Sequence, residues 1–287
     1  MKKIVILGCE NSHANNFLKA IAESYSDIEV VGIYSDEAEA AAKLSESFGV
    51  PVMSAYDEAV GKVDGVIITA RHGDNHYKYA KPYIKSGVPM FIDKPITCSG
   101  DEAVEFMRSL REAGVRITGG SSLRQADMIK KLRYDRENNV GGETLGGFIK
   151  APLNSKSTYG GFYFYAQHLV EMVLEVFGRY PKSVKAFTAK GEQKTVVFRY
   201  ENYDVTALYT ENSYTYFAAR MAVQENAGGP VTLEGCFNAE FAEFYDVLVG
   251  KEQTVSFDDF IAPVFVMDAI NEAIRTGEEV AVKEYKV

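Results

Sequence analysis

The sequence lacks the features that several common classes of protein require. Its 31 basic residues are outnumbered by 40 acidic ones, for a net charge of −9. Because nucleic-acid binding depends on clustered Lys and Arg that displace counterions, we expect no nucleic-acid partner. No stretch approaches the ~18 apolar residues of a membrane span, and the apolar run after Met1 stops at Gly8, too early for a signal peptide. We therefore expect no membrane partner and a cytoplasmic location.

Cysteine and histidine are scarce as well. Cys9, Cys98 and Cys236 stand far apart without metal-ligand spacing, and there are only four histidines. His168 and Glu171 lie three residues apart on an expected helix, which allows a metal pair, but no second pair with ligand spacing accompanies them. The sequence therefore predicts reduced thiols and no metal.

The first part of the chain alternates buried-strand patterns with amphipathic helix patterns. Strands are expected at 4–7, 29–34, 63–69, 88–92 and 115–118. Helices are expected at 17–22, 38–48, 76–86 and 101–113, two of them ended by Gly49 and Gly87. This alternation predicts an α/β fold in which residues 1–120 form a Rossmann doubly wound parallel sheet, the usual dinucleotide-binding domain.

The alternation stops at a run of hinge composition, Gly119-Gly120-Ser121-Ser122. Beyond it, helices are expected at 125–135, 238–249 and 257–276, and strands at 146–151 and 183–189. The runs 195–200, 205–209, 214–223 and 231–233 are typical of an antiparallel meander. We therefore expect residues 121–287 to form a C-terminal α+β domain with a mostly antiparallel open sheet, serving substrate binding and oligomerisation.

Aromatic residues are clustered in the expected strands of this second domain. They are Phe198, Tyr200, Tyr209, Tyr214, Tyr216 and Phe217. On an open sheet face they would form a self-association surface for a homodimer or homotetramer. The alternative is that the C-terminal helices cover them.

The turn after the first strand is where a dinucleotide fold places its phosphate-binding glycines. Gly8 occupies the first glycine position, but Glu10 and His13 occupy the second and third. The Glu10 carboxylate would repel a diphosphate unless its side chain turns away. The position in the strand–helix–strand unit still favours cofactor binding, by Gly8, Asn11, Ser12 and His13. The alternative is a tight turn in which Asn11 or Ser12 caps the helix.

An acidic residue at the end of the second strand normally binds the adenosine ribose. Here Ser35 and Asp36 follow that strand, and Asp36 would serve one position late. Because Ser35, Asp36 and Glu37 offer a hydroxyl and two negative charges but no cation for a 2′-phosphate, NAD is favoured over NADP. An exposed acidic turn is the alternative.

The strand at 88–92 delivers Asp93-Lys94-Pro95 to the sheet edge where ligands of α/β proteins bind. With this run the chain resembles the Gfo/Idh/MocA family of oxidoreductases, whose members carry Glu-Lys-Pro here in a Rossmann domain followed by an α+β domain. The strand 63–69 before a loop ending in His76, and the run 86–89 leading into the lysine strand, support the resemblance.

The resemblance implies that Lys94 contacts substrate and nicotinamide and assists proton transfer. It also implies cofactor contacts from the ends of these two strands, by Thr69, Ala70, Arg71, His76, Asp93, Lys94 and Pro95. The loop 70–76 is longer and more polar than is usual in the family, so Arg71 or His72 either has a binding role or caps the next helix. Outside this context, a Lys-Pro pair after a strand is more often a solvated loop.

A second family segment is a Gly-Gly pair before a helix bearing Asp-x-Gly-x-His. Gly160-Gly161 and His168 are similar to it, but Phe164 replaces the aspartate and Ala166 the glycine. The resemblance makes His168 the catalytic histidine, while a packed core histidine is the alternative. The expected substrate contacts are Tyr163, Tyr165 and Gln167, with Arg124 and Asn154 added for their location.

Together these features predict an NAD(P)-dependent oxidoreductase that transfers hydride between nicotinamide and a sugar, inositol-like or related polyol substrate. Lys94 and His168 would assist proton transfer. The alternative within the enzyme class, implied by the resemblance, is that the bound nicotinamide serves for transient oxidation during elimination or hydrolysis. The alternative from another class is a catalytically silent family member that binds or senses a small molecule.

Overall fold

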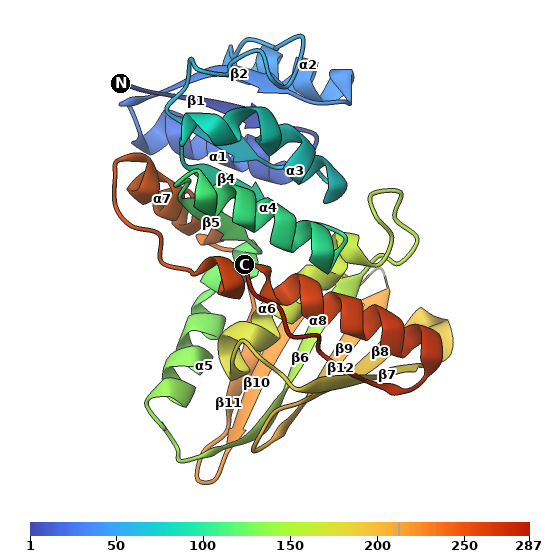
Figure 1. The fold of residues 1–287 in the computed structure, drawn as a ribbon. Coiled ribbons are helices and arrows are strands. Elements are labelled where there is room, and N and C mark those ends of the chain that lie inside the picture. Colours follow the sequence, from blue (N-terminus) through green and yellow to red (C-terminus); the bar gives the residue numbers. More distant parts are fainter. Residues whose placement is uncertain (212) are drawn as a thin grey trace. The chain divides into compact units, whose positions relative to one another are not determined.

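The alternating strands and helices of the first 120 residues form a five-stranded sheet in which every neighbouring pair is parallel. The strand order is β2-β1-β3-β4-β5. The strands are β1 (Lys2–Leu7), β2 (Ile28–Tyr34), β3 (Gly65–Ile68), β4 (Met90–Asp93) and β5 (Ile117–Gly120). The connecting helices are α1 (Ser12–Ser24), α2 (Ala38–Phe48), α3 (Asp74–Ala80), the 3₁₀ helix η1 (Lys81–Ser86) and α4 (Gly100–Glu112). The predicted α/β fold is confirmed (Figure 1).

Local sequence explains these elements. The strands β3 and β4 are buried along their whole length, as expected of strands covered by helices on both faces. Gly49 and Gly87 end α2 and η1 in the left-handed conformation. In the sheet, β1 has β2 on one side and β3 on the other, because the chain runs from β1 to β2 and then crosses to β3. The carboxyl ends of β1 and β3 therefore flank the switch point, where ligands of such sheets bind.

The structure describes residues 1–211 and 213–287, which form two compact units. The first unit contains residues 1–120, 237–257 and Val287, and the second contains residues 121–236 and 258–286. Among the described residues there is no helix with the length and apolar character needed to cross a membrane.

The helix α7 (Cys236–Leu248) departs from the expected division of the chain. Its place in the chain predicts that it belongs to the second domain, but its residues 237–248 belong to the first unit. Its apolar residues join the core around α1, with the Phe241 ring 5.6 Å from that of Phe17. A Cβ on Gly65 would meet Leu248 at 2.7 Å and Phe244 at 3.0 Å. Burial of this apolar face, rather than continuity of the chain, decides where the helix packs.

The second unit contains a seven-stranded sheet with the order β11-β10-β6-β9-β8-β7-β12. Its strands are β6 (Thr144–Leu153), β7 (Ser183–Thr188), β8 (Lys194–Arg199), β9 (Asp204–Glu211), β10 (Tyr216–Ala222), β11 (Ala227–Val231) and β12 (Glu279–Ala281). The predicted meander is wrong at one place, because β6 lies between β9 and β10 and pairs parallel with β9. The other pairs are antiparallel, which confirms a mostly antiparallel sheet.

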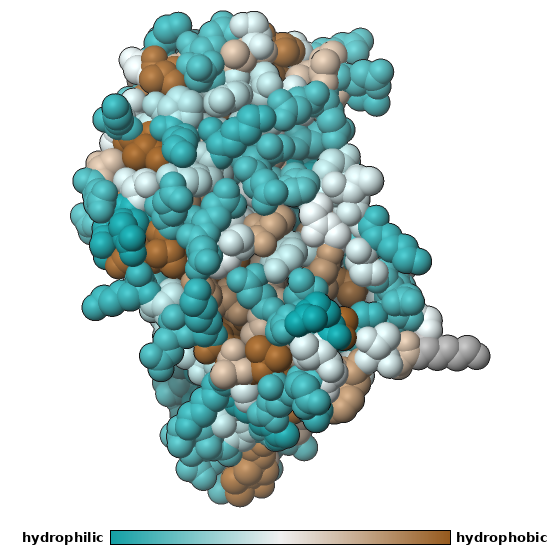
Figure 2. All heavy atoms as spheres, turned by 45° about the vertical axis from the view of Figure 1, so that its right-hand side comes forward, coloured by the Kyte–Doolittle hydropathy of each residue, from teal (hydrophilic) through white to brown (hydrophobic). Residues whose placement is uncertain are grey.

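Helices pack on this sheet and decide which aromatic residues are exposed. They are η2 (Ser122–Gln125), α5 (Asp127–Glu137), α6 (Tyr163–Phe177) and α8 (Phe257–Thr276), while η3 (Lys190–Glu192) is a short turn before β8. Phe198 and Tyr209 are fully buried, so they cannot form the expected self-association surface, whereas Tyr214 and Phe217 remain partly exposed. In the view of Figure 2, hydrophilic residues predominate and hydrophobic ones gather in separate patches.

Candidate active site

The turn between β1 and α1 is held tightly against the end of β3. Gly8 has a φ of +78°, and a Cβ there would lie 2.4 Å from the backbone of Ala70. The Gly8 N–H donates to the Tyr34 carbonyl at 2.7 Å, and the Thr69 hydroxyl donates to the Gly8 carbonyl at 2.9 Å. Glycine is therefore needed at this first position, and the turn stays at the carboxyl ends of β1 and β3.

The start of α1 is capped by Asn11, whose side chain accepts the His13 N–H. This is the capping arrangement expected as the alternative to cofactor binding. It is compatible with an anion at the same helix end, because the first turn of a helix carries several N–H groups without intrahelical partners. Ser12 is exposed, whereas the His13 ring is buried and turned toward β4 and α7.

Glu10 stands at the second glycine position, and two donors hold its carboxylate. Oε2 accepts the Ser35 hydroxyl at 2.7 Å, and Oε1 accepts the Arg71 N–H at 2.9 Å. These donors lie just past the ends of β2 and β3, so the side chain extends across that edge of the sheet instead of over the start of α1. The residues present thus fit a dinucleotide whose diphosphate meets the helix end, with one nearby carboxylate offset by two hydrogen bonds.

Asp36 is surrounded by donors. Its carboxylate accepts the Tyr34 hydroxyl at 2.7 Å and lies 3.4 Å from the Lys78 amine, and the Tyr79 hydroxyl also donates to it. Although desolvation opposes ionisation, these three donors hold the pKa of Asp36 below its ordinary value. The acidic group expected for the ribose is therefore an ordered carboxylate on the switch-point side of the sheet.

Asp93 is the centre of a buried polar cluster at the end of β4. Its carboxylate accepts the Lys94 N–H at 2.7 Å and the Asn11 amide at 2.8 Å, and its Oδ2 lies 3.0 Å from His13 Nδ1. Burial by itself would raise the pKa of Asp93, but His13, Lys94 and His76 hold it far below its ordinary value. Asp93 is fully buried, so it orders Asn11 and His13 of the expected cofactor turn.

Glu240 on α7 is a member of this cluster that sequence reasoning missed. It is fully buried, and its Oε2 lies 3.7 Å from His13 Nε2. That ring nitrogen finds no hydrogen-bond partner among the described residues. No local signal could have revealed Glu240, because it lies more than 200 residues after His13 in the sequence.

Lys94 follows directly, joined to Pro95 by a cis peptide bond. It is only 5% exposed. Burial lowers the pKa of its amine, Asp93 and Glu240 oppose this, and Arg71 adds to the lowering. A buried lysine between opposing charges at the ligand-binding edge of a parallel sheet is suited to exchange a proton with a bound group.

His76 braces the loops that carry these residues. Its Nε2 lies 2.8 Å from the Ala70 carbonyl and its Nδ1 lies 3.2 Å from the Ile96 carbonyl. The ring is fully buried, and this burial lowers the pKa of His76. His76 therefore joins the loop after β3 to the loop after β4 from within the first unit.

In the second unit, His168 is fixed by a serine just after the first unit ends. Ser121 Oγ lies 2.6 Å from His168 Nδ1. The Tyr165 and Tyr216 rings lie 5.4 Å and 6.2 Å from the imidazole, which is 6% exposed. The hydroxyl at Nδ1 orients the ring.

The expected substrate contacts of this unit are placed differently from one another. Gln167 is fully buried and donates to Glu171 at 2.9 Å. Burial raises the pKa of Glu171, against the opposing charges of Arg179 and Arg124. Tyr163 donates to Asp268 at 2.7 Å. The Asn154 carbonyl accepts the Ser157 N–H. Tyr165 is in ring contact with His168.

A parallel sheet with a switch point, a capped helix end beside it and a buried lysine define an α/β protein of the Rossmann class. Residues 2–121 match the Gfo/Idh/MocA model, described as an oxidoreductase family with an NAD-binding Rossmann fold. This match over the amino-terminal part of the chain confirms the predicted resemblance to that family. No curated protein matches the sequence.

Solved structures share the fold over the whole chain. A myo-inositol dehydrogenase from Corynebacterium glutamicum is 17% identical with a TM-score of 0.84, covering 99% of this chain and 100% of its own. A scyllo-inositol dehydrogenase from Lactobacillus casei, with bound NAD(H) and scyllo-inositol, is 13% identical with a TM-score of 0.85, covering 98% and 99%. GenD2 from gentamicin A biosynthesis, in complex with NAD, is 14% identical with a TM-score of 0.84, covering 99% and 97%. At these identities the likeness establishes the fold.

Proposed function

We propose that the chain is an NAD-dependent dehydrogenase acting on a sugar, an inositol or a related polyol, with Lys94 and His168 assisting proton transfer. The observation that carries the proposal is Lys94, a buried amine at the ligand-binding edge of a sheet whose family binds NAD. The inositol and NAD described for the solved relatives support the substrate class and the cofactor.

When bound, the nicotinamide supplies hydride transfer. Toward it, this chain offers the N–H groups at the start of α1 for the diphosphate and Asp36 for the adenosine ribose. We propose cofactor contacts by Gly8, Asn11, Ser12, His13, Ser35, Asp36, Thr69, Ala70, Arg71, His76, Asp93, Lys94 and Pro95. The buried members of this set, Asp93 and His76 among them, act by positioning the turn and loops.

The proposed preference for NAD over NADP rests on charge. The Glu10 carboxylate, which is bonded to Ser35, and Asp36 both lie at the end of β2, where a 2′-phosphate would be placed. The Lys78 amine lies 3.4 Å from the Asp36 carboxylate, with which it is paired. A 2′-phosphate would therefore meet two carboxylates and an amine that is already shared.

His168 is the proposed partner in proton transfer. Its Nδ1 is held by Ser121, and we propose that Nε2 exchanges the proton of a substrate hydroxyl. Tyr165, Arg124, Asn154, Tyr163 and Gln167 remain the proposed substrate-binding set. Because Tyr163 and Gln167 are bonded to Asp268 and Glu171, we expect Tyr165 to contribute more directly than those two.

A second candidate function is a catalytically silent protein that binds a dinucleotide or a small molecule. The observations that favour it are Glu10 at a glycine position and Phe164 in place of the family aspartate. It differs from the enzyme in a measurable way, because it predicts cofactor binding without turnover.

The first test is calorimetric titration of nucleotide-stripped protein with NADH and with NADPH. We expect micromolar binding of NADH and weaker binding of NADPH. A screen of inositols and sugar derivatives for reduction of NAD⁺ follows. Failure to bind either nucleotide at millimolar concentration would sink the proposal, and binding without turnover would favour the silent protein.

The matched variants for this test are Lys94→Met and Lys62→Met. Both remove an amine, but Lys62 is exposed and its amine donates to the Glu58 carbonyl, away from the sheet edge. Loss of a positioned acid or base costs about 10²–10⁴-fold in rate, so kcat should fall by that order for Lys94→Met and stay unchanged for Lys62→Met. Equal rates for the two variants would remove Lys94 from the chemistry.

A further inference from the structure

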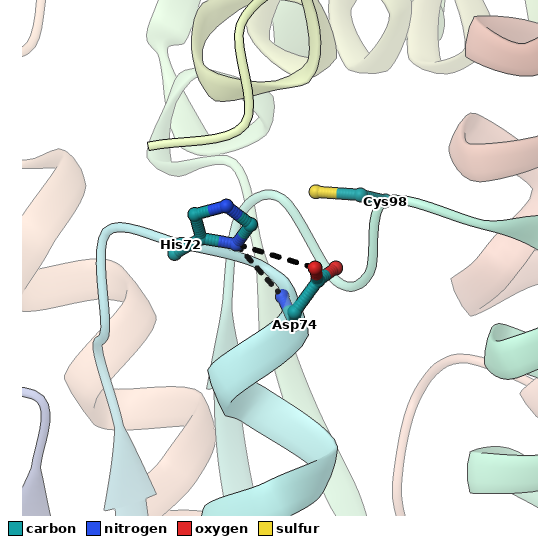
Figure 3. A group of neighbouring side chains, drawn as sticks. All are labelled: His72, Asp74 and Cys98. Carbon is teal, nitrogen blue, oxygen red and sulfur yellow. Dashed lines mark hydrogen bonds and ion pairs between the residues drawn. The ribbon is translucent and has the colours of Figure 1, made fainter. Parts of the chain in front are cut away.

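Three side chains that metals favour converge on one place in the first unit. His72 Nδ1, a carboxylate oxygen of Asp74 and Cys98 Sγ all lie within 4.8 Å of one another. His72 Nδ1 and Asp74 Oδ2 are 3.7 Å apart. Figure 3 shows the imidazole, the carboxylate and the sulfur directed toward a common space. The proposed dehydrogenase function gives these three residues no role.

The convergence follows from the sheet. His72 and Asp74 come after β3 and Cys98 comes after β4, and these strands are parallel neighbours, so both loops leave the same edge. Gly73 packs so closely on the second loop that a Cβ would lie 3.0 Å from the Pro95 carbonyl oxygen and 3.1 Å from Cys98 Sγ. The His76 brace joins the same two loops. The backbone behind the three side chains is therefore held by packing.

The three groups supply donor atoms of the kinds that metals bind. The Asp74 N–H donates to His72 Nδ1 at 3.3 Å, which holds the imidazole beside the start of α3. Cys98 Sγ lies within 4.8 Å of both the imidazole nitrogen and the Asp74 carboxylate oxygen. A cation that takes the place of the thiol proton would meet sulfur, nitrogen and oxygen donors together, the set that zinc prefers.

The distances suit a small cation. Zinc bonds of about 2.0–2.3 Å in a tetrahedron place the ligand atoms about 3.3–3.6 Å apart. The 3.7 Å between His72 Nδ1 and Asp74 Oδ2, and the upper limit of 4.8 Å for all three pairs, need only a small closure. The side chains of His72 and Asp74 are 31% and 61% exposed, so they can rotate to make it, and water can reach the site.

We propose that His72, Asp74 and Cys98 form a site for a divalent cation of the zinc type, with three protein ligands and a fourth position open to water. Binding forms a sulfur–metal bond at Cys98 and releases the thiol proton to solvent. The site needs neither dinucleotide nor substrate, so it stands whether or not the proposed dehydrogenase activity is found.

The experiment uses the full chain, freed of metal with a chelator and dialysed. Zinc binding is measured by competition with a chromophoric indicator of micromolar affinity, and Co²⁺ is added separately to detect a sulfur-to-cobalt charge-transfer band. The variants are Cys98→Ser, His72→Ala and Asp74→Asn. Cys236→Ser is the matched control, because its thiol donates to the Thr232 carbonyl, which a hydroxyl can also do. Circular dichroism checks that each variant folds.

We expect the wild type to bind one equivalent of zinc and to show the cobalt band. Changes to the surroundings of metal ligands cost about 10–100-fold in affinity, so removing a ligand should weaken zinc binding at least about tenfold. Cys98→Ser should also lose the band, while Cys236→Ser keeps both. Absence of zinc binding in the wild type overturns the proposal, as does binding that survives in Cys98→Ser. Asp74→Asn alters an exposed side chain, so it tests the site even if Cys98→Ser fails to fold.

Discussion

Replacing Asp93 by Asn removes one charge from the buried cluster and keeps the shape of the side chain. The carboxylate receives Lys94 N–H on one oxygen, and Asn11 and His13 on the other. An amide has one acceptor and one donor end, so in either orientation its NH₂ group faces at least one of these donors. The variant therefore creates a donor–donor conflict without creating a cavity.

The expected cost follows from complete burial. Removing one partner of a buried charged pair costs about 3–5 kcal/mol, because the remaining group stays uncompensated. The pKa of Asp93 is depressed in the folded state, so its contribution to stability is present above the unfolded-state pKa and is lost as the pH falls. The difference between wild type and variant should therefore shrink below about pH 4.

Urea unfolding followed by far-UV circular dichroism measures this difference, since the chain has no tryptophan to report by fluorescence. The control is Asp64→Asn, whose carboxylate accepts the Lys3 N–H at 2.7 Å from a partly exposed position. We expect that control to cost less than about 1.5 kcal/mol. Equal costs for the two variants, or a cost for Asp93→Asn that is the same at pH 7 and in acid, would refute the reasoning.

Three further predictions concern single contacts. Ser121→Ala removes the 2.6 Å hydrogen bond to His168, so kcat should fall by a factor of about 5–10 and its pH profile should shift. Ser121→Thr should restore both the rate and the profile. An unchanged pH profile would mean that the serine is only structural. Glu10→Gln removes a negative charge beside the expected diphosphate. At an effective dielectric constant of about 20, NADH should bind about 1–2 kcal/mol more tightly, as measured by calorimetry. Weaker binding would instead make Glu10 a cofactor ligand. Gly73→Ala places a Cβ 3.0 Å from the Pro95 carbonyl oxygen and should destabilise the first unit by about 1–3 kcal/mol in urea unfolding, which an unchanged midpoint would contradict.

Much of the fold could be predicted because its signals are local. Runs of apolar β-branched residues such as 63–69 mark strands buried on both faces, and Gly49 and Gly87 mark helix ends by their left-handed conformation. The motif around Lys94 was readable for the same reason, since a strand end and the residues after it are neighbours in the chain. The structure buries Lys94 at this edge, and its role in proton transfer stays a prediction.

Other features depend on segments far apart in sequence. The insertion of β6 between β9 and β10 was missed, because strand patterns give no information about which strands pair. The assignment of α7 to the first unit was missed as well, since an amphipathic helix carries the same pattern whichever core it covers. Glu240 lies on α7 and was missed for the same reason, although it is the second carboxylate beside His13.

The sequence by itself determined the alternation of strands and helices, the carboxyl edge of the parallel sheet and the lysine on it, because each depends on residues within a few positions of one another. The tertiary structure alone decided the surroundings of those residues. In the folded chain the Glu10 carboxylate accepts the Ser35 hydroxyl, and the Asp93 carboxylate lies among three donors. Cys98 lies beside His72 and Asp74. Cysteine spacing predicted no metal, since spacing describes ligands on one segment, whereas parallel neighbouring strands bring together loops that are distant in the chain.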